Sequence, residues 1–444
     1  MKKVLIISYS YPPSNAAAAQ RPYFLAKYLK QNSFEPLVLT SNSTNSSLGN
    51  SEWATHNNIL VIRTKKNKLA KLEASSNNLI SISGHDKLSL IKTIKSKIIS
   101  FIASSLLPKV MIPDKAFHWK KVGSRVGEKI ILRYKPDIIF STSPSVVNHL
   151  VAKKLASKFD IKWVADFRDC YYTGYLEERK WLRRYIDRKI ERSIIKSADF
   201  LTFISPMMLE LYRARYYDLK SNSDFIYNGF DEDEFNLIKE IKSSNKKIII
   251  FYAGSFYKGV RNPIPLFKAM EYLLDQGKIY LKDFEIQIAG NFDASLLNEL
   301  KGFKSLENLK LLGVIPRQSV LKKYKESNLL WLIIGDHISH YVGFPVKGYE
   351  YIGAQRPLLI FSPKPAECEN IVNDLECGVI LKNQVDDKST KNNAILIFNI
   401  IESINNKSQI QDSKFDGRLK KYTRKEQTSL FSKIFNTILD DEKS

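Results

Sequence analysis

The sequence has few cysteines and no long apolar run, and both shortages narrow the class of protein. Its 444 residues contain three cysteines, an odd number without the close spacing of a zinc site: Cys170, Cys368 and Cys377. This favours a reduced, cytoplasmic protein over a disulfide-stabilised secreted one. No apolar run approaches the roughly 18–20 residues that span a bilayer, so we expect no transmembrane helix.

Two further signals are missing near the start of the chain. The apolar run after Lys2-Lys3 ends at Ser8 and is followed by Tyr-Pro-Pro instead of a cleavage site, so we interpret residues 4–7 as a first β-strand and not as a signal peptide. The glycine pattern G-x-G-x-x-G is also absent, so a standard dinucleotide-binding turn is not expected.

Acidic residues are scarce in the first half of the chain only. Residues 1–225 hold 38 Lys and Arg against 18 Asp and Glu, whereas residues 226–444 hold 31 against 28. Nearly all of the net charge of +23 therefore belongs to the first half. Such a one-sided field suits an anionic surface such as a membrane, a nucleic acid or a polyphosphate, although a Lys-rich composition without a partner gives the same count.

Strand and helix patterns alternate along both halves, and the length suffices for two domains with sizeable cores. The opening strand is followed by a loop, a helix and a second strand, and the same order restarts with an apolar run at residues 248–253. This alternation predicts the α/β class with two doubly wound sheets. We predict an N-terminal domain over residues 1–225, a C-terminal domain over residues 226–424 and a last helix within residues 425–444.

The stretch Gly343 to Leu359 combines a cation and a carboxylate close to a predicted helix start. It follows a buried strand, and Pro345 suits the first turn of a helix. Lys347 and Glu350 lie three positions apart and so share one helix face. Open α/β sheets bind phosphorylated ligands at such a place, although an ordinary surface ion pair has the same spacing.

A second candidate segment follows the strand at residues 248–253. Gly254 ends this strand, and a glycine there lets backbone N–H groups approach phosphate oxygens. Ser255 comes next, and Lys258 and Arg261 lie within reach of the same place, without the sequence deciding between them. An ordinary strand–helix loop is the alternative.

Charged residues also end a predicted strand of the first half. Residues 161–165 lead into Asp166-Phe167-Arg168-Asp169, at the strand end where a site is well placed. The alternative is an Asp–Arg pair that fixes the turn.

The segment at residues 87–107 has the pattern of a basic amphipathic helix. Its apolar residues recur at helical spacing between lysines: Ile91, Ile94, Ile98, Ile102 and Leu106, with Lys87, Lys92, Lys95 and Lys97. Such a helix can lie at an anionic membrane surface, but a core helix with a solvated lysine face is the alternative. His337 and His340 lack an evident third ligand, so we predict no metal site.

The run Pro345-x-Lys347-x-x-Glu350-Tyr351, with Arg356-Pro357 and an apolar strand after it, resembles the donor-site helix of family 4 glycosyltransferases, which have the GT-B fold. In that family the glutamate holds the donor ribose and the lysine-bearing segment faces the diphosphate. The second glutamate that the family often carries eight positions earlier is absent, because Val342 stands there.

Other elements resemble the family in the same order along the chain. They are Pro12-Pro13 with Arg21, the Asp166-x-Arg168-Asp169 element, and Asn228-Gly229-Phe230-Asp231 at the entry to the second domain. Alanines at 16–19 replace the usual glycines and could equally form the first turn of a helix. Ser255 replaces a usual arginine, and Val260 stands where a lysine would fall.

The resemblance implies two Rossmann-like domains facing a cleft, with the last helix crossing back to the first domain. It implies retaining, metal-independent transfer of a hexosyl group from a UDP- or GDP-sugar to a glycan or lipid-linked acceptor, in cell-surface polysaccharide synthesis such as that of lipopolysaccharide or capsule. The residues it implies are catalytic Lys347, Arg261, Asp166 and Arg168, donor-binding Gly254, Ser255, Lys258, Glu350, Pro345 and Tyr351, and acceptor-side Asn15, Arg21 and Asp169.

We therefore expect a cytoplasmic glycosyltransferase, peripheral on the inner face of an anionic membrane, that needs no cofactor and no metal. Two alternatives of other classes remain: a non-catalytic GT-B partner protein and a basic nucleic-acid-binding protein. No recognised nucleic-acid-binding signature accompanies the charge, so no nucleic-acid partner is expected. A sugar-nucleotide epimerase of the same fold is a weaker alternative.

Overall fold

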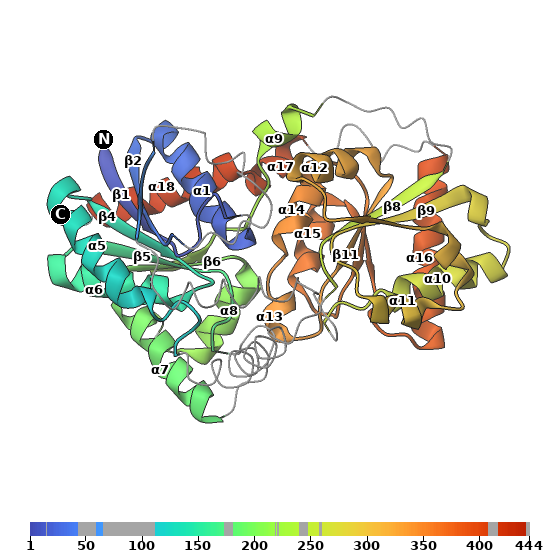
Figure 1. Ribbon diagram of the computed structural model, residues 1–444, viewed down its shortest axis with the longest axis horizontal. Helices are drawn as coiled ribbons and strands as arrows, with labels where there is room; N and C mark the ends of the chain where they lie inside the picture. Colours follow the sequence, from blue (N-terminus) through green and yellow to red (C-terminus); the bar gives the residue numbers. More distant parts are fainter. Residues whose placement is uncertain are drawn as a thin grey trace, which may run out of the picture. The chain divides into compact units, whose positions relative to one another are not determined.

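The computed structural model describes residues 1–14, 16–42, 59–64, 112–172, 181–217, 219, 222–238, 247–256, 260–406 and 416–440. The predicted helix at residues 87–107 and the candidate residues Asn15 and Lys258 lie outside these. The chain divides into two compact units, coloured blue to green and yellow to red for the most part in Figure 1. Unit 1 contains Met1–Ile204, Leu211–Ile226 and the chain from Thr428 on, and unit 2 contains Ser205–Glu210 and Tyr227–Gln427.

Unit 1 is built on a parallel sheet whose described strands follow the order β3-β2-β1-β4-β5-β6-β7. The strands are β1 (Lys2–Ile7), β2 (Phe34–Thr40), β3 (Leu60–Arg63), β4 (Ile138–Thr142), β5 (Lys162–Phe167), β6 (Phe200–Phe203) and β7 (Ser223–Phe225). Both faces of β1 are buried, as its unbroken apolar run requires in a parallel sheet. Because the strand order reverses between β1 and β4, this is a doubly wound sheet.

The helices of unit 1 connect these strands and cover the sheet. They are α1 (Ala17–Leu29), α5 (Trp119–Tyr134), α6 (Val146–Phe159), α7 (Trp181–Ser197), α8 (Pro206–Arg215), whose first turn belongs to unit 2, and the part of α18 (Arg424–Asp440) from Thr428 on. Since α1 begins at Ala17, three of the four alanines at 16–19 form its first turn. This is the helical alternative given for these alanines in the sequence. Within unit 1, Phe431 and Phe435 of α18 pack edge-on against Phe140 of β4, with ring centroids 5.1 and 6.0 Å apart.

Unit 2 repeats the doubly wound pattern with the strand order β10-β9-β8-β11-β12-β13 among its described residues. Its strands are β8 (Ile248–Ala253), β9 (Phe284–Ala289), β10 (Leu309–Gly313), β11 (Leu329–Ile333), β12 (Leu358–Phe361) and β13 (Gly378–Leu381). All pair in parallel, and the order reverses between β8 and β11. This reversal is the switch point at which open sheets of this kind bind ligands.

The helices of unit 2 are α9 (Glu232–Asn236), α10 (Ile264–Asp275), α11 (Ala294–Leu300), α12 (Arg317–Glu326), α13 (Ile338–Tyr341), α14 (Val346–Gly353), α15 (Glu367–Leu375), α16 (Asp387–Asn405) and α17 (Asp416–Leu419). Most of them lie between the strands of unit 2 in the sequence, whereas α9 precedes β8 and α16 and α17 follow β13. The predicted fold class, α/β with two doubly wound sheets, is therefore confirmed. No helix within the described ranges is long and apolar enough to cross a membrane.

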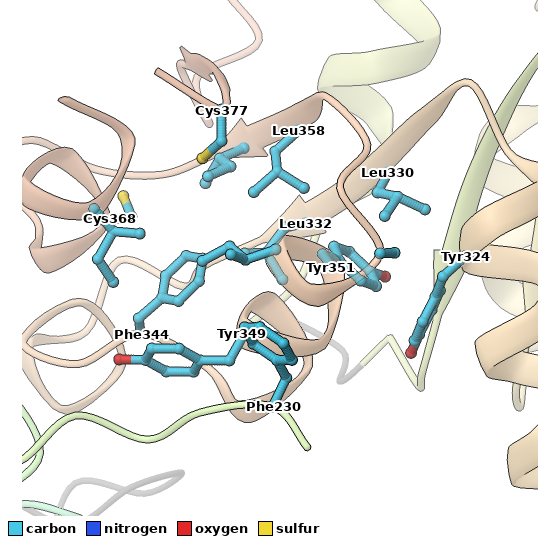
Figure 2. Close-up of a cluster of buried hydrophobic side chains, with 14 of the residues drawn as sticks. Phe230, Tyr324, Leu330, Leu332, Phe344, Tyr349, Tyr351, Leu358, Cys368 and Cys377 are labelled. Atoms are coloured by element: carbon cyan, nitrogen blue, oxygen red, sulfur yellow. The ribbon is translucent and has the colours of Figure 1, made fainter. Parts of the chain in front are cut away.

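A buried core fixes α14 against the sheet of unit 2 (Figure 2). Tyr349 and Tyr351 of α14 are fully buried among leucines of β11 and β12, including Leu332 and Leu358. The rings of Tyr351 and Tyr324 meet edge to face with their centroids 4.8 Å apart. Burying side chains of this size contributes roughly 1.5–3 kcal/mol each, so α14 is held rigidly where its polar residues are needed.

Candidate active site

Helix α14 begins at the switch point of unit 2, directly after Pro345. This proline is the N-cap residue, with the extended backbone angles φ −60° and ψ 144°, and its carbonyl accepts a hydrogen bond from the Gly348 N–H at 2.8 Å. A side chain at position 348 would collide with the ring of Phe344, because a Cβ there would lie 2.4 Å from it. The glycine therefore lets the loop before α14 pack tightly on its first turn.

Lys347 points from the first turn of α14 to the carboxyl end of β8. Its Nζ donates a hydrogen bond to the Ala253 carbonyl at 3.2 Å and lies 3.9 Å from the centre of the Tyr252 ring. Burial lowers the pKa of Lys347 well below its usual value, the charge of Arg261 lowers it further, and the carboxylate of Glu350 acts in the opposite direction. A half-buried ammonium with these neighbours is well prepared to bind an anion.

Glycines shape the backbone beside this ammonium. Gly254 follows β8 with φ +133° and Gly290 follows β9 with φ +136°, both in the region that favours glycine. A Cβ at Gly290 would lie 2.3 Å from the Gly254 carbonyl oxygen, so the two strand ends approach closely only because Gly290 lacks a side chain. The site predicted at Gly254 and that predicted at Lys347 are thus one place, since Nζ lies 3.3 Å from the Cβ position of Gly254.

Arg261 adds a second cation to the same strand end. Its Nη1 donates a hydrogen bond to the Ser255 carbonyl at 3.2 Å, across the loop that follows β8. The sequence did not decide between Lys258 and Arg261 as the second cation. Arg261 lies within the described residues, and its charge lowers the pKa of Lys347. Lys258 lies outside them.

Glu350 does not pair with Lys347, although both belong to one helix. Its Oε1 accepts a hydrogen bond from Nη1 of Arg317 at 2.8 Å, and the Tyr324 hydroxyl lies 3.4 Å from its Oε2. Nη2 of Arg317 also contacts Glu234 at 2.6 Å, so one guanidinium bridges two carboxylates. Burial alone would lower the pKa of Arg317, but Glu350 and Glu234 raise it above its usual value.

Arg317 is the residue of this site that sequence reasoning missed. It is the first residue of α12, directly after the loop that follows β10. A basic residue at the start of a helix that follows a strand end was the available signal, but nothing in the spacing connects it to Glu350, 33 positions later.

Tyr351 has a different role from the predicted one. Its hydroxyl accepts a hydrogen bond from the Ala253 N–H at 3.1 Å and its side chain is fully buried. Burial raises the pKa of this hydroxyl. Tyr351 therefore holds α14 against β8 and positions Lys347, and its contact with the donor stays a prediction.

In unit 1, Asp166 and Arg21 form a buried ion pair. The Arg21 guanidinium donates from Nε and Nη2 to the two carboxylate oxygens at 2.9 and 2.8 Å, and the hydroxyls of Thr142 and Thr202 donate at 2.6 and 2.8 Å. Arg21 also donates to the Ile226 carbonyl at 2.9 Å. Burial alone would raise the pKa of Asp166, but Arg21 lowers it below its usual range.

These contacts give Asp166 and Arg21 a structural role, and their predicted roles in the reaction stay predictions. Both side chains are almost completely inaccessible, at 0% and 2% exposure, and each has its partners inside unit 1. The pair joins α1 to β5, so it differs from the local Asp–Arg pair at the turn that was the alternative interpretation.

Arg168 and Asp169 lie at the end of the same strand and differ in exposure. Arg168 donates to the carbonyls of Ser143 and Ala18 at 2.5 and 3.1 Å, and its catalytic role stays a prediction. Burial lowers its pKa to about 10. Asp169 is partly exposed, and burial raises its pKa while Arg168 opposes this. Asp169 is the residue of this segment that can still face a ligand.

The two histidines of the H-x-x-H motif lie beside each other without further ligands in the described part of the chain. His337 contacts the hydroxyl of Ser339 at 2.6 Å, and the two imidazole centroids are 5.7 Å apart. No group of three or more His, Cys, Asp or Glu side chains gathers at metal-binding distance among the described residues. The absence of a metal from the reaction stays a prediction.

Comparison with known proteins gives the class of protein to which this geometry corresponds. Residues 107–234 match the sequence model of the family described as Glycosyltransferase Family 4. No curated protein sequence matches the chain. The family match therefore rests on the segment that contains α5 to α8 and the start of α9.

The fold is similar to solved structures over nearly the whole chain. Sucrose-phosphate synthase from Thermosynechococcus elongatus is 13% identical, with 99% of this chain and 100% of that chain covered and a TM-score of 0.63. A glycosyltransferase from Rickettsia africae ESF-5 is 13% identical, with 99% and 98% covered and a TM-score of 0.64. Anabaena HepE in complex with UDP and glucose is 11% identical, with 98% and 100% covered and a TM-score of 0.59.

These findings confirm the resemblance to family 4 glycosyltransferases and the GT-B fold that the sequence predicted. The family model matches residues 107–234, and the structural matches show the fold of both units.

Proposed function

We propose that the protein transfers a hexosyl group from a UDP- or GDP-sugar to a glycan or lipid-linked acceptor, with retention of configuration and without a metal ion. The observation that carries this proposal is the position of Lys347. Its half-buried ammonium lies 3.2 Å from the Ala253 carbonyl at the switch point of a doubly wound sheet, beside two strand-end glycines and Arg261. This is a place built for a diphosphate.

The chemical task of such an enzyme is to stabilise the diphosphate as it leaves the sugar. Lys347 and Arg261 bring two positive charges to the end of β8, and the first turn of α14 adds backbone N–H groups to the same place. Donors fixed before the reaction stabilise developing negative charge without reorganisation. These groups can therefore neutralise the negative charge of the diphosphate without a metal ion.

Glu350 is suited to bind the ribose of the donor. A carboxylate accepts hydrogen bonds from neighbouring hydroxyls, and Arg317 holds this one in a single orientation from 2.8 Å. Because Arg317 is itself fixed by Glu234 at 2.6 Å, the carboxylate is ordered before the donor arrives. Preorganisation of this kind lowers the entropic cost of binding.

Two structurally similar proteins support the substrate classes. The HepE structure contains UDP and glucose, and a trehalose-phosphate synthase from Burkholderia xenovorans, 10% identical with a TM-score of 0.61, is in complex with glucose 6-phosphate. The positive charge of residues 1–225 suits an anionic acceptor and the anionic face of a membrane. We therefore propose a peripheral enzyme of cell-surface polysaccharide synthesis.

A thermal-shift screen tests the proposal. The protein is titrated with UDP, GDP, UDP-sugars and GDP-sugars, with and without Mg²⁺, and a ligand at 100 times its dissociation constant should stabilise the fold by about 2.7 kcal/mol. We expect one nucleotide series to raise the midpoint independently of Mg²⁺, and Glu350→Ala to remove that shift. No shift with any nucleotide would contradict the proposal and favour a non-catalytic GT-B protein.

A further inference from the structure

Helix α7 has two chemically distinct faces, and its two acids both lie on the inner one. Asp187 accepts hydrogen bonds from the Tyr171 hydroxyl at 2.5 Å and from Nε of Arg183 at 2.9 Å. Glu191, one turn later, accepts from the hydroxyls of Tyr212 and Tyr216 at 2.6 and 2.5 Å. Both carboxylates are completely buried inside unit 1, so they add no negative charge to the exposed face of the helix.

The outer face of α7 exposes large apolar side chains that the interior does not use. Trp181 is 78% exposed, Leu182 53% and Tyr185 54%. They occupy the first turns of the helix, where Tyr185 lies three positions after Leu182 and four after Trp181, the spacings that place helical side chains next to each other. Isolated apolar side chains are ordinary on a protein surface, but three adjacent ones, two of them aromatic, form a patch.

The same face is basic throughout. Its exposed charged residues are all positive: Arg184, Arg188, Lys189 and Lys196. Nζ of Lys189 lies 4.5 Å from the centre of the Tyr185 ring, so cations and aromatic rings are interleaved on this surface. Within Trp181–Ser197, which the structure describes in full, no acidic side chain is exposed.

We propose that the outer face of α7, formed by Trp181, Leu182, Arg184, Tyr185, Arg188, Lys189 and Lys196, docks the protein on an anionic lipid bilayer. Tryptophan and tyrosine favour the boundary between lipid headgroups and acyl chains, and lysine and arginine favour anionic headgroups. A bilayer accepts both kinds of side chain at once. Figure 1 shows α7 at the periphery of unit 1.

The apolar residues distinguish a bilayer from a nucleic acid as the occupant. Phosphates of a nucleic acid would pair with the basic residues and bases could stack on Trp181 or Tyr185, but an exposed Leu182 beside them gains little there. In the interfacial region of a bilayer, leucine and the aromatic rings are all buried from water.

This inference extends the proposed function by naming the surface through which the enzyme would reach a lipid-linked acceptor. Docking on vesicles needs neither donor nor acceptor, whereas the nucleotide screen needs no lipid. Each proposal can therefore fail while the other holds.

Vesicle co-sedimentation of the full chain tests the surface. The probes are vesicles of phosphatidylcholine alone and of phosphatidylcholine with phosphatidylglycerol. We expect binding to the anionic vesicles that weakens as salt rises. The triple variant Arg184→Glu, Arg188→Glu, Lys189→Glu should lose about 100-fold or more in affinity, since each basic residue contributes about fivefold.

The apolar part of the patch needs its own variant and a direct readout. Replacing Trp181, Leu182 and Tyr185 together with alanine should lower the affinity by at least about tenfold at unchanged charge. Brominated lipids in the anionic vesicles should quench tryptophan fluorescence in the wild type, and Trp181→Phe should bind similarly while losing most of that quenching. Circular dichroism and the thermal midpoint verify that each variant is folded.

Matched controls come from surfaces of the same protein. Leu132 is 69% exposed but isolated, so Leu132→Ala should bind like the wild type. Reversing three exposed lysines of unit 2, Lys301, Lys388 and Lys391, makes the same change in net charge and should lower the affinity much less than the α7 reversal.

Three results would overturn the proposal. The first is wild-type protein that does not bind anionic vesicles. The second is binding that both α7 variants leave unchanged, which would place the contact elsewhere. The third combines two observations. The charge reversal abolishes binding to a random single-stranded oligonucleotide, and the triple alanine variant still binds vesicles like the wild type. Together they would assign the face to nucleic acid.

Discussion

Each unit contains a carboxylate–guanidinium pair made by residues far apart in the sequence, and the two pairs have different consequences. Arg21 and Asp166 in unit 1 are 2% and 0% exposed, and Thr142 and Thr202 complete the shell around the carboxylate. Arg317 in unit 2 is 26% exposed and bonds Glu350, which lies on the same helix as Lys347, the proposed diphosphate ligand. The same chemistry therefore stabilises the fold in one place and prepares a ligand site in the other.

The largest expected effect is on the pair of unit 1. Asp166→Ala leaves the Arg21 guanidinium buried without its carboxylate, which should lower the free energy of unfolding by about 3–5 kcal/mol. Chemical denaturation measures this loss, and Asp224→Ala, on an exposed position of β7, is the control. In a double-mutant cycle, Arg21→Ala and Asp166→Ala together should cost much less than the sum of the single changes. Additive costs would show that the two residues do not act as a pair.

The next effect concerns catalysis in unit 2 and should leave stability almost intact. Lys347→Ala should lower kcat by roughly 100-fold or more, since a fixed donor to developing negative charge is lost. Lys347→Arg should recover part of the rate because it keeps the charge. Lys388→Ala, an exposed lysine on α16, serves as the control. A loss below about tenfold in steady-state assays would remove Lys347 from the reaction.

An effect of intermediate size is expected for Arg317, whose guanidinium bridges Glu234 and Glu350. Arg317→Lys keeps a positive charge but loses the planar fork that contacts both carboxylates, so the donor KM should rise by roughly tenfold while kcat changes little. Arg317→Ala should raise KM further, whereas Arg356→Lys, which alters an arginine bonded to the Lys325 carbonyl, should not. Equal changes of KM in the two lysine variants would contradict a specific role for Arg317.

The sequence was sufficient for the fold because the fold depends on local patterns. The strand predicted before Gly343 is β11, and the last helix, expected within residues 425–444, spans Arg424–Asp440. Helix α1 begins at Ala17 and includes three of the four alanines, since alanine is the best helix former.

The roles of charged residues could be predicted only in part, because they depend on partners that spacing does not reveal. Lys347 and Glu350 share a helix face as expected, yet one contacts β8 and the other a residue of α12. Asp166 looked like a site residue at a strand end, but Arg21, 145 positions earlier, and two threonines saturate it. A sequence pattern places a charge at the edge of a sheet and leaves open whether the interior neutralises it.

The smallest expected effect is the dependence of donor binding on pH, and it concerns Lys347 of unit 2. Burial and Arg261 lower the pKa of Lys347 in the empty site, and a bound diphosphate would raise it again. Between the lowered and the raised pKa, binding should therefore take up a fraction of a proton, and affinity should fall as pH rises. Calorimetry in two buffers of different ionisation enthalpy measures this uptake. Lys347→Arg should abolish it, because arginine stays protonated, whereas Lys388→Arg should not; uptake that survives in Lys347→Arg would belong to another group.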